Sequence, residues 1–402
     1  MFTCGKMNSF TDELNRRLGA LREQNLFREL RRVDSAQGPR IEIGGKTLLN
    51  FSSNDYLGLA SHPALKEAAI RAVETFGAGA GASRLISGSL APFHQLEDLL
   101  AAYKKTEAAL TFATGFAAAL GTITALTGKD DVIILDKLVH ASIVDAARLA
   151  GAKLRIFDHN NLNDLEDKLK WAKEEFRSRH PESVILIVTE SIFSMDGDAA
   201  PLREIVALKE KYGAWLMVDE AHATGIFGSH GRGRAEALGV GDQIEIQMGT
   251  LGKALGASGG YICGTRGLID LLINQARSFI FSTAPVPAAA AAATAAIQLM
   301  TTAEGEARRK TLWQLIELLN TKLLLSSAQL PSAIIPLILG DESRAVAAAA
   351  DLRTKDIFIP AIRYPTVARG TARLRITLTA THSAADVTTL VHALEPLIHG
   401  TS

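Results

Sequence analysis

Cysteine is scarce in this chain. Only Cys4 and Cys263 occur among 402 residues, too few for a disulfide framework, and they lack the spacing of a zinc site. We therefore expect no bound metal and a reducing compartment, the cytoplasm. No basic segment followed by an apolar stretch opens the sequence, and no apolar run reaches the roughly eighteen residues of a membrane helix. Whether translation begins at Met1 or Met7 stays open.

A net charge of either sign is also lacking. Lys plus Arg and Asp plus Glu number 43 each, so the basic excess typical of nucleic-acid binding is missing. The densest basic stretch, residues 28–32, contains Glu29 and is typical of a solvated helix face. Apolar residues are plentiful at 47%, against 21% charged, which indicates a soluble globular chain with a large core.

The N-terminal region predicts two small elements. Leucines recur at approximately helical spacing with charges between them over residues 9–32, which predicts a helical arm. Residues 41–49 then alternate about the pair Gly44-Gly45, as the strands of a β-hairpin do.

A long alternation of helix and strand begins near residue 61. The strand-like runs are short, rich in β-branched residues and apolar on both faces: 131–135, 154–157, 184–189, 215–219 and 245–248. With helical segments between several of them, they predict an α/β fold with a mainly parallel sheet covered by helices on both sides. The functional site of such a sheet lies at the carboxyl ends of its strands.

A different pattern follows Pro285. An alanine-rich stretch over 285–297 predicts a buried, tightly packed helix, and helical sequence continues to about residue 328. Strands near 334–339, 357–362 and 373–379 and helices near 343–354 and up to 398 then predict a smaller α+β domain. The expected division is an arm and hairpin over 1–60, a large α/β domain over 61–295 and a small C-terminal domain over 296–402.

Lys253 and Asp219 carry the most informative chemistry. Each follows an apolar strand-like run, and the two are about one βαβ unit apart. A lysine amine condenses with the aldehyde of pyridoxal phosphate (PLP), and a carboxylate against the pyridine nitrogen keeps it protonated, so that the ring accepts electrons. Glycines surround Lys253 at 249, 252, 256, 259 and 260 and give the amine and a ligand room. Taken alone, Asp219 could equally be a helix cap or a buried structural acid.

Two glycine-rich runs do not indicate nucleotide binding. Residues 77–82 match the loose dinucleotide fingerprint, but a helical run over 63–76 precedes them where the fingerprint requires a strand. The segment ending in Gly252-Lys253 resembles a P-loop, yet Gln247 replaces its first glycine and Ala254 its hydroxyl residue.

Further polar residues follow the strand runs and are candidates for the same cofactor. His222 and Ser194 could reach its phenolic oxygen, although a packed histidine and a turn hydroxyl are the alternatives. His140 starts a helix and could stack on a planar ring, or merely cap that helix.

A phosphate site is expected where a helix opens after the strand 108–112. Thr114, Gly115 and Phe116 would offer amides to an anion there, with a simple βα turn as the alternative. Thr250 and the pair Ser282 and Thr283 could also bind the phosphate, or be plain turn residues. For a substrate carboxylate, Arg375 is the candidate because guanidinium binds carboxylates bidentately; Arg373 is its rival, and a surface position is the alternative.

By these residues the chain resembles the α-oxoamine synthases, fold type I PLP enzymes that join an amino acid to an acyl thioester with loss of carbon dioxide. The resemblance runs from about residue 10 to the C-terminus and rests on motifs in residues 54–59, 81–89, 193–198, 218–225 and 370–380.

The resemblance implies a role for each matching position. Lys253 would bind PLP covalently and move the α-proton of the substrate, with Asp219 on the pyridine nitrogen and His140 stacked on the ring. The implied contacts are Ser194 and His222 for the phenolic oxygen; Gly115, Phe116 and Thr250 for the phosphate; Ser282 and Thr283 for the phosphate of a neighbouring subunit; Arg375 and Asn54 for the amino-acid carboxylate; and Arg28 and Thr366 for the acyl path.

Within the family, the motifs look most like the biotin-pathway branch that condenses L-alanine with pimeloyl-CoA or a pimeloyl-acyl carrier protein. The stretches 83–89 and 362–367 favour that branch over members that use glycine. A homodimer with shared active sites is expected. A non-catalytic, phosphate-binding module on the same fold is the alternative from another class.

Overall fold

The computed structural model describes residues 7–323 and 331–399 in two compact units. The first comprises Met1–Ser53, Ile334–Leu378 and His382–Ser402, and the second Asn54–Ala333 and Thr379–Thr381. Cys4, and the end of the helix expected to reach residue 328, lie outside the described residues. In the described part, no helix combines the length and apolar character needed to cross a membrane.

The predicted hairpin is confirmed and belongs to the first unit. Strands β1 (Arg40–Ile43) and β2 (Lys46–Asn50) pair antiparallel around Gly44 and Gly45, whose φ angles of 59° and 75° are left-handed. Glycine adopts this conformation without the steric penalty of a Cβ, which explains the Gly-Gly pair at the turn. On its other side, β2 pairs with β11 (Ile357–Phe358) from the C-terminal region.

The N-terminal helix is shorter than its periodicity predicts. Helix α1 (Met7–Glu23) ends where Asn25 adopts a left-handed φ of 56°, and the Leu26 amide turns back to the Leu21 carbonyl. Residues 26–33 form no regular element. The expectation that the helix extends to residue 32, with residues 28–32 as its solvated face, is therefore wrong: leucine spacing predicted a helix that an asparagine at its end interrupts.

The rest of the first unit is the predicted α+β arrangement. Strand β13 (Ala372–Thr377) lies between β10 (Ile334–Gly340) and β12 (Ala361–Ile362), and both pairings are antiparallel. Helices α13 (Glu342–Thr354) and α14 (Ala384–His399) complete the unit.

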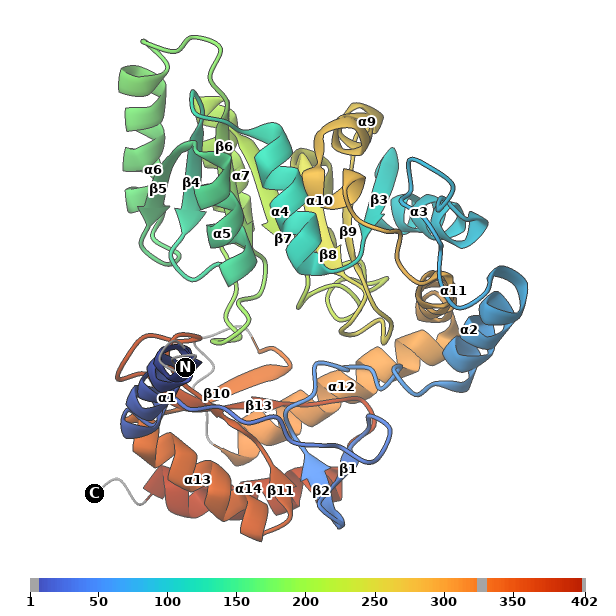
Figure 1. Cartoon of the computed structure of the whole chain (residues 1–402), viewed down its shortest axis with the longest axis vertical. Coiled ribbons are helices and arrows are strands. Elements are labelled where there is room, and N and C mark those ends of the chain that lie inside the picture. The colour runs from blue at the N-terminus through green and yellow to red at the C-terminus, as the bar shows by residue number, and fades with distance from the viewer. Residues whose placement is uncertain (1–6, 324–330, 400–402) are drawn as a thin grey trace, which may run out of the picture. The chain divides into compact units, whose positions relative to one another are not determined.

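A seven-stranded sheet organises the second unit (Figure 1). Its strand order is β3-β9-β8-β7-β6-β4-β5, and β5, β4, β6, β7 and β8 run parallel. Strand β9 is antiparallel to both β3 and β8. The mainly parallel sheet is thus confirmed, whereas β9 had no counterpart among the predicted strands. The strands are β3 (Ala108–Phe112), β4 (Val132–Asp136), β5 (Lys153–Phe157), β6 (Ile185–Glu190), β7 (Trp215–Asp219), β8 (Ile246–Thr250) and β9 (Gly260–Gly264).

Helices cover this sheet and bury its central strands, since every residue of β4 and β6 is buried. Helices α4 and α5 lie side by side over it (Figure 1). The helices are α2 (Pro63–Phe76), α3 (Ala91–Lys104), α4 (Gly115–Leu126), α5 (Ala141–Ala150), α6 (Leu162–Trp171), α7 (Leu202–Tyr212), α8 (Arg234–Leu238), α9 (Arg266–Gln275), α10 (Arg277–Ile280), α11 (Pro287–Met300) and α12 (Ala303–Lys322). Helix α2 directly precedes Gly77, as expected for a glycine run that is no dinucleotide fingerprint.

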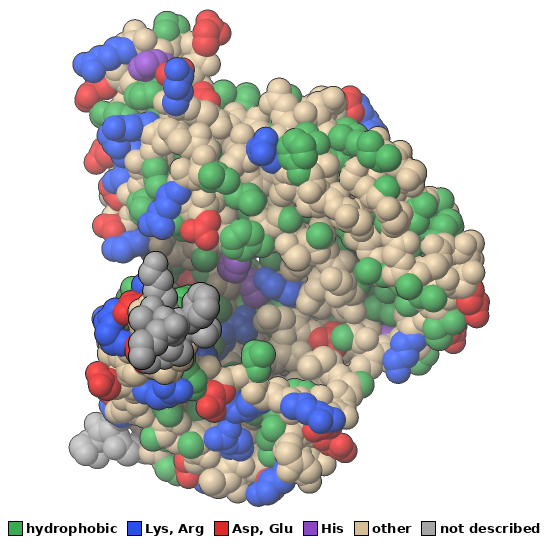
Figure 2. All heavy atoms as spheres, viewed as in Figure 1, with side chains coloured by type: hydrophobic (Ala, Val, Ile, Leu, Met, Phe, Trp, Pro, Cys, Tyr) green, Lys and Arg blue, Asp and Glu red, His purple; other side chains and the backbone are tan. Residues whose placement is uncertain are grey.

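The two units do not follow the sequence-based division at residues 60 and 295. Helix α12 belongs to the second unit, because the Trp313 indole donates to the Ile226 carbonyl (3.3 Å) and packs edge-on against Phe227. The hairpin joins the C-terminal strands instead, through β2 and β11. On the face shown in Figure 2, basic and acidic side chains are interspersed, in keeping with the zero net charge.

Candidate active site

Three parallel strands of the second unit deliver polar residues to one edge of the sheet. Strand β6 ends at Glu190, β7 at Asp219 and β8 at Thr250, and the register pairs Glu190 with Asp219. Lys253 follows β8 by three residues. Since parallel strands end at the same edge, this is where an α/β sheet binds its ligand, as the sequence predicted.

A chain of hydrogen-bonding side chains leads to the Lys253 amine. His222 Nε2 lies 2.7 Å from Lys253 Nζ, and His222 Nδ1 lies 2.7 Å from the Tyr56 hydroxyl. The Tyr56 hydroxyl in turn donates to Asn54 Oδ1 (3.3 Å). With that direction of donation, the His222 Nδ1–H donates a hydrogen bond to the Tyr56 hydroxyl oxygen, and His222 Nε2 accepts one from the Lys253 amine. Tyr56 is fully buried and His222 is 5% exposed, so both rings are fixed by packing.

Two buried carboxyl groups lie beside this chain. Burial raises the pKa of Asp219, while the positive charge of Lys253 acts in the opposite direction. The Asp219 Oδ1 accepts a hydrogen bond from the Ala221 amide (2.8 Å). Burial, and then the neighbouring Asp219 carboxylate, raise the pKa of Glu190 well above its usual range. Two adjacent buried carboxyl groups disfavour a second negative charge, and a bound cation near Asp219 would relieve the repulsion.

His140 caps helix α5 and also belongs to the electrostatic environment of the site. Its Nδ1 accepts from the Ser142 amide (3.2 Å) and lies 2.8 Å from the Ser142 hydroxyl. Desolvation lowers the pKa of His140, Asp219 opposes this shift, and Lys253 adds to it. His140 therefore caps helix α5, as the alternative interpretation predicted. The capping hydrogen bonds also orient its ring, so capping does not exclude a role in the site.

The expected phosphate site lies where α4 begins. Thr114 caps the helix by accepting from the Ala117 amide (3.0 Å), which leaves the Gly115 and Phe116 amides at its first turn. A Cβ on Gly115 would lie 3.8 Å from the Thr250 Cβ, so strand β8 ends beside the helix. The Thr250 hydroxyl donates to the Gly259 carbonyl (2.9 Å) and accepts from the Gly252 amide (3.2 Å). Thr250 therefore also stabilises a turn, which is the alternative role that the sequence suggested for it.

Ser194 is buried in the loop between β6 and α7. The Ser191 amide at the start of this loop donates a hydrogen bond to the Asp219 carbonyl (2.9 Å), which links the loop to β7. Ser282 and Thr283 follow helix α10 and line a small cavity together with Ala113, the residue before Thr114. Thr283 forms an isolated antiparallel bridge with Ser83, and its side chain is exposed.

The remaining candidates lie in the first unit, apart from Asn54. Arg28 donates to the Thr366 hydroxyl (3.2 Å) and to the Tyr364 carbonyl (3.3 Å), so the two residues expected on the acyl path are neighbours. Arg373 and Arg375 are both buried on β13 and, two residues apart, share one face of the strand. The alternative of a surface strand position is therefore wrong for Arg375.

Sequence reasoning assigned no role to Tyr56 or Glu190, although Tyr56 lies within a motif that carries the family resemblance. A buried tyrosine shows its importance only when its partner is known, and His222 is 166 residues away. Glu190 is the last residue of a strand, one position beyond the apolar run that marked the strand. The position at a strand end, which selected Asp219, would have selected Glu190 as well.

Comparisons with known proteins give the chain its class. The family model for aminotransferase class I and II matches residues 46–394. Among solved structures, a serine palmitoyltransferase from S. paucimobilis with a bound PLP-myriocin adduct superposes with a TM-score of 0.89 at 30% identity, covering 97% of this chain and 98% of that one. The fold type I, PLP-dependent class expected from the sequence is confirmed.

The curated relatives identify the family within this class. The 8-amino-7-oxononanoate synthases of Anaeromyxobacter dehalogenans and Geotalea daltonii are each 47% identical over 96% of this chain, and cover 96% and 97% of their own lengths. The solved 8-amino-7-oxononanoate synthase of Francisella tularensis has a TM-score of 0.72 at 28% identity and covers 88% of this chain and 97% of its own. The chain therefore belongs to the 8-amino-7-oxononanoate synthase family, and its cofactor is PLP.

The second unit fits this cofactor on its own chemistry. An amine, Lys253, and a buried acid, Asp219, lie at adjacent strand ends, and a capped helix with its first amides available begins beside them. Small residues keep the helix and sheet close: a Cβ on Gly260 would lie 2.6 Å from the Gly115 Cα. An amine for the aldehyde, an acid for the ring nitrogen and a helix N-terminus for the phosphate are the three groups that PLP requires.

Proposed function

We propose that this chain condenses L-alanine with a pimeloyl thioester, releasing carbon dioxide and the free thiol and forming 8-amino-7-oxononanoate for biotin synthesis. The observation that carries the proposal is the chain Lys253–His222–Tyr56 beside the buried Asp219. The 43–48% identity to curated 8-amino-7-oxononanoate synthases supports L-alanine rather than glycine as the amino acid.

PLP, when bound, accepts the electron pair left on the α-carbon of the amino acid. Lys253 would hold the coenzyme and, once displaced by the substrate, take the α-proton at Nζ. His222, at 2.7 Å from that atom, would orient the amine and exchange a proton with it. Tyr56 holds the histidine in the tautomer that accepts from the lysine.

Asp219 would face the pyridine nitrogen and keep its proton in place. The acid is suited to this role because it is buried, so that its charge is fully felt by a cationic neighbour. His140 would lie against the ring and Ser194 and His222 near the phenolic oxygen, while Gly115, Phe116 and Thr250 would bind the phosphate. Arg375 and Asn54 would bind the substrate carboxylate, and Arg28 and Thr366 would line the acyl path.

We also propose a cytoplasmic homodimer in which Ser282 and Thr283 reach the phosphate in the partner subunit. Their neighbours support this: Ile86 and Phe281 are 80% and 71% exposed in the single chain, close in sequence to the bridged residues Ser83 and Thr283. Large apolar side chains exposed together mark a surface that another protein covers.

An assay of amino acids against acyl thioesters tests the proposal. L-Alanine, glycine and L-serine would each be offered with pimeloyl-, acetyl-, succinyl- and palmitoyl-CoA, and pimeloyl-acyl carrier protein would be compared with pimeloyl-CoA. Serine and palmitoyl-CoA are included because serine palmitoyltransferases are among the similar solved structures. We expect alanine with a pimeloyl thioester to be turned over fastest; a preference for glycine or serine would contradict the proposal.

A further inference from the structure

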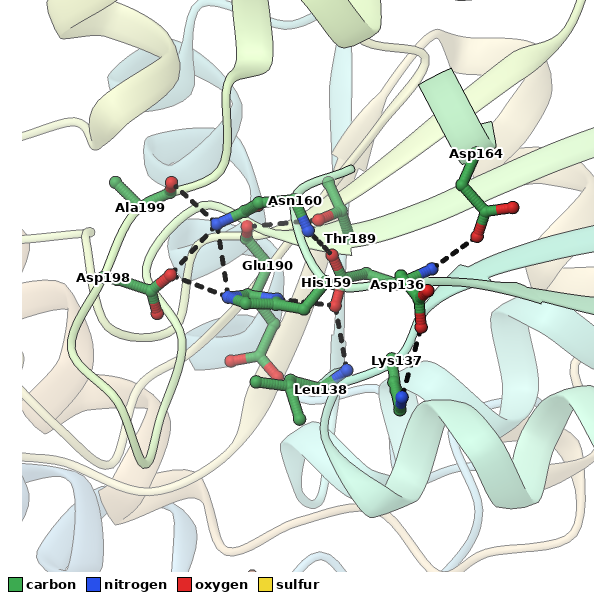
Figure 3. Close-up of polar contacts among 11 residues, drawn as sticks. Asp136, Lys137, Leu138, His159, Asn160, Asp164, Thr189, Glu190, Asp198 and Ala199 are labelled. Carbon is green, nitrogen blue, oxygen red and sulfur yellow. Dashed lines mark hydrogen bonds and ion pairs between the residues drawn. The ribbon is translucent and has the colours of Figure 1, made fainter. Parts of the chain in front are cut away.

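A histidine outside the site described above lies between two carboxylates (Figure 3). His159 Nδ1 is 2.9 Å from Asp136 Oδ1, and His159 Nε2 is 2.7 Å from Asp198 Oδ2. We call these three residues the His159 clamp. The Asp136 carboxylate is completely buried, the other two side chains are 24% and 16% exposed, and the Phe193 ring packs edge-on against the imidazole at 4.4 Å.

The geometry requires a charged imidazole. A neutral imidazole donates through one nitrogen only, so its other nitrogen would place a lone pair against a carboxylate. With both nitrogens facing carboxylate oxygens, the imidazolium satisfies both acceptors. Desolvation opposes the charge, but the hydrogen bonds to Asp136 and Asp198 outweigh it and raise the pKa of His159 to about 10. Charged groups nearby include the exposed Lys137–Asp158 pair and Asp164, which accepts from the Asp158 amide. Glu190 lies beside the imidazole in Figure 3, and Arg203, Glu204 and Arg234 line a pocket together with Asn160 and Asp198.

The clamp joins two segments that carry proposed site residues. Asp136 is the last residue of β4, and its carboxylate also accepts from the amides of Leu138 (2.8 Å) and Asn160 (3.0 Å). The turn that it shapes in this way leads directly to His140. Asp198 belongs to the loop 191–200, which contains Ser194, and the Asn160 side-chain amide adds a second bond to its carboxylate (3.0 Å).

The loop 191–200 transmits the position of Asp198 to Ser194. The Phe193 amide donates to the Asp198 carbonyl, and the Gly197 amide donates back to the Phe193 carbonyl, both at 2.9 Å. Ile192 and Ala199 bridge across the base of the loop. Because these bonds make the loop one closed unit, a displacement of Asp198 would displace Ser194 with it.

We propose that His159 is a positioning residue whose imidazolium fastens the loop 191–200 to the end of β4 and thereby holds Ser194 and His140 in place for the reaction. The part about catalysis rests on the proposed function, whereas the part about the two segments does not. In this proposal His159 acts through the segments it joins and not on the reacting atoms.

Hydrogen exchange of the full-length protein tests the structural part. In His159→Gln, amides of residues 136–140 and 191–200 should exchange at least about fivefold faster than in the wild type, because both lose the link that limits local opening. The rest of the second unit should keep its rates. His180→Gln is the control, since His180 also lies near a carboxylate, Asp130 at 3.9 Å, but is partly exposed and outside the clamp. Unchanged exchange in both segments would overturn the proposal.

The pH dependence separates a charged clamp from simple packing. A histidine whose pKa is raised on folding stabilises the protein fully below its unfolded pKa, and this contribution is lost as pH rises through the folded pKa. The difference in unfolding temperature between wild type and His159→Gln should therefore be largest near pH 6 and shrink towards pH 10. Asp198→Asn removes one of the two charges and should move this fall to lower pH. A difference that is constant from pH 6 to pH 10 would contradict the charge.

The catalytic part is measured with L-alanine and pimeloyl-CoA. A displacement of Ser194 and His140 by about 1 Å would lower kcat by about 10- to 100-fold. Both His159→Gln and Asp198→Asn should show such a loss, and His180→Gln should not. If His159→Gln does not fold, Asp198→Asn carries the test alone. Normal kcat in a variant with faster exchange would overturn the positioning role, whereas a wild type inactive with alanine and pimeloyl-CoA would overturn the proposed function instead.

Discussion

Tyr56 joins Asn54 to His222 through one buried hydroxyl, so its removal tests the role of the histidine orientation. Tyr56→Phe leaves the ring in place and frees His222 to rotate or change tautomer. We expect kcat to fall at least about tenfold, since proton transfer by a positioned group contributes about 10²- to 10⁴-fold. The loss of buried hydrogen bonds should lower stability by about 1–2 kcal/mol.

Tyr103→Phe is the matched control for that substitution. Tyr103 is also buried, and its hydroxyl donates to the Gly231 carbonyl (2.6 Å), away from the site. It should lower the stability by a similar amount and leave kcat unchanged. Equal activity losses in the two variants would show that Tyr56 acts through stability alone.

Asp219 should be required for turnover, while its buried charge lowers the stability of the native state. A carboxyl whose pKa is raised on folding destabilises the native state increasingly as pH rises above its unfolded pKa. Asp219→Asn keeps an acceptor for the Ala221 amide and removes the charge. The cofactor-free variant should therefore unfold at the same or a higher temperature than the cofactor-free wild type at pH 7, while turnover falls by at least about 10³-fold.

Asp386→Asn is the matched control and should change the unfolding temperature in the opposite direction. Desolvation raises the pKa of Asp386, but hydrogen bonds from Ser383 and the charge of Arg40 outweigh this effect and leave the pKa lowered. The charge of Asp386 therefore stabilises the fold at pH values above the unfolded pKa. This variant should unfold at a lower temperature at pH 7. A destabilised Asp219→Asn would contradict the assignment of Asp219 as a buried acid that functions at a cost in stability.

At the level of elements, the closeness of α4 to the sheet determines the phosphate site. Gly260 on β9 allows the start of α4 to approach, and a Cβ there would lie 2.6 Å from backbone atoms of Gly115. Gly260→Ala should push the first turn of α4 away and weaken PLP binding at least about tenfold, as measured by titrating the cofactor-free protein. Gly267→Ala, in α9 with open space at its Cβ, should leave PLP binding unchanged.

The elements also show how far the sequence alone leads. Gly44-Gly45 and the β-branched runs predicted the hairpin and the parallel strands because local sequence decides those features. Strand β9 was missed because its glycines indicated room for a ligand, and their role as a close-packed strand depends on α4. In the site, strand ends predicted Asp219 and Lys253, but Tyr56 and His159 depend on partners distant in sequence.

At the level of the whole molecule, the proposed dimer predicts complementation between inactive chains. Lys253→Ala and the double variant Ser282→Ala/Thr283→Ala should each be strongly impaired alone. If Ser282 and Thr283 serve the partner's phosphate site, a mixed dimer has one site with an intact Lys253 and an intact Ser-Thr pair. Mixing the variants under conditions that exchange subunits should then restore activity, up to about half of the wild-type value when every dimer is mixed.

The same mixing experiment shows whether Ser282 and Thr283 serve the phosphate site of the partner subunit or that of their own chain. If the pair served its own chain, each site of the mixed dimer would lack either the lysine or the hydroxyls, and activity would not return. A monomeric protein, seen by sedimentation at about the 42.9 kDa of one chain, would contradict the dimer itself.

The covalent attachment of PLP to Lys253 is the central claim, and trapping that bond tests it most directly. Borohydride reduction of the purified protein fixes the cofactor to its lysine, and peptide mass spectrometry then locates it. We predict one pyridoxyl phosphate group per chain, on the peptide that contains Lys253, and none in Lys253→Ala. A cofactor attached to another lysine, or a wild-type protein that carries none after incubation with PLP, would contradict the account.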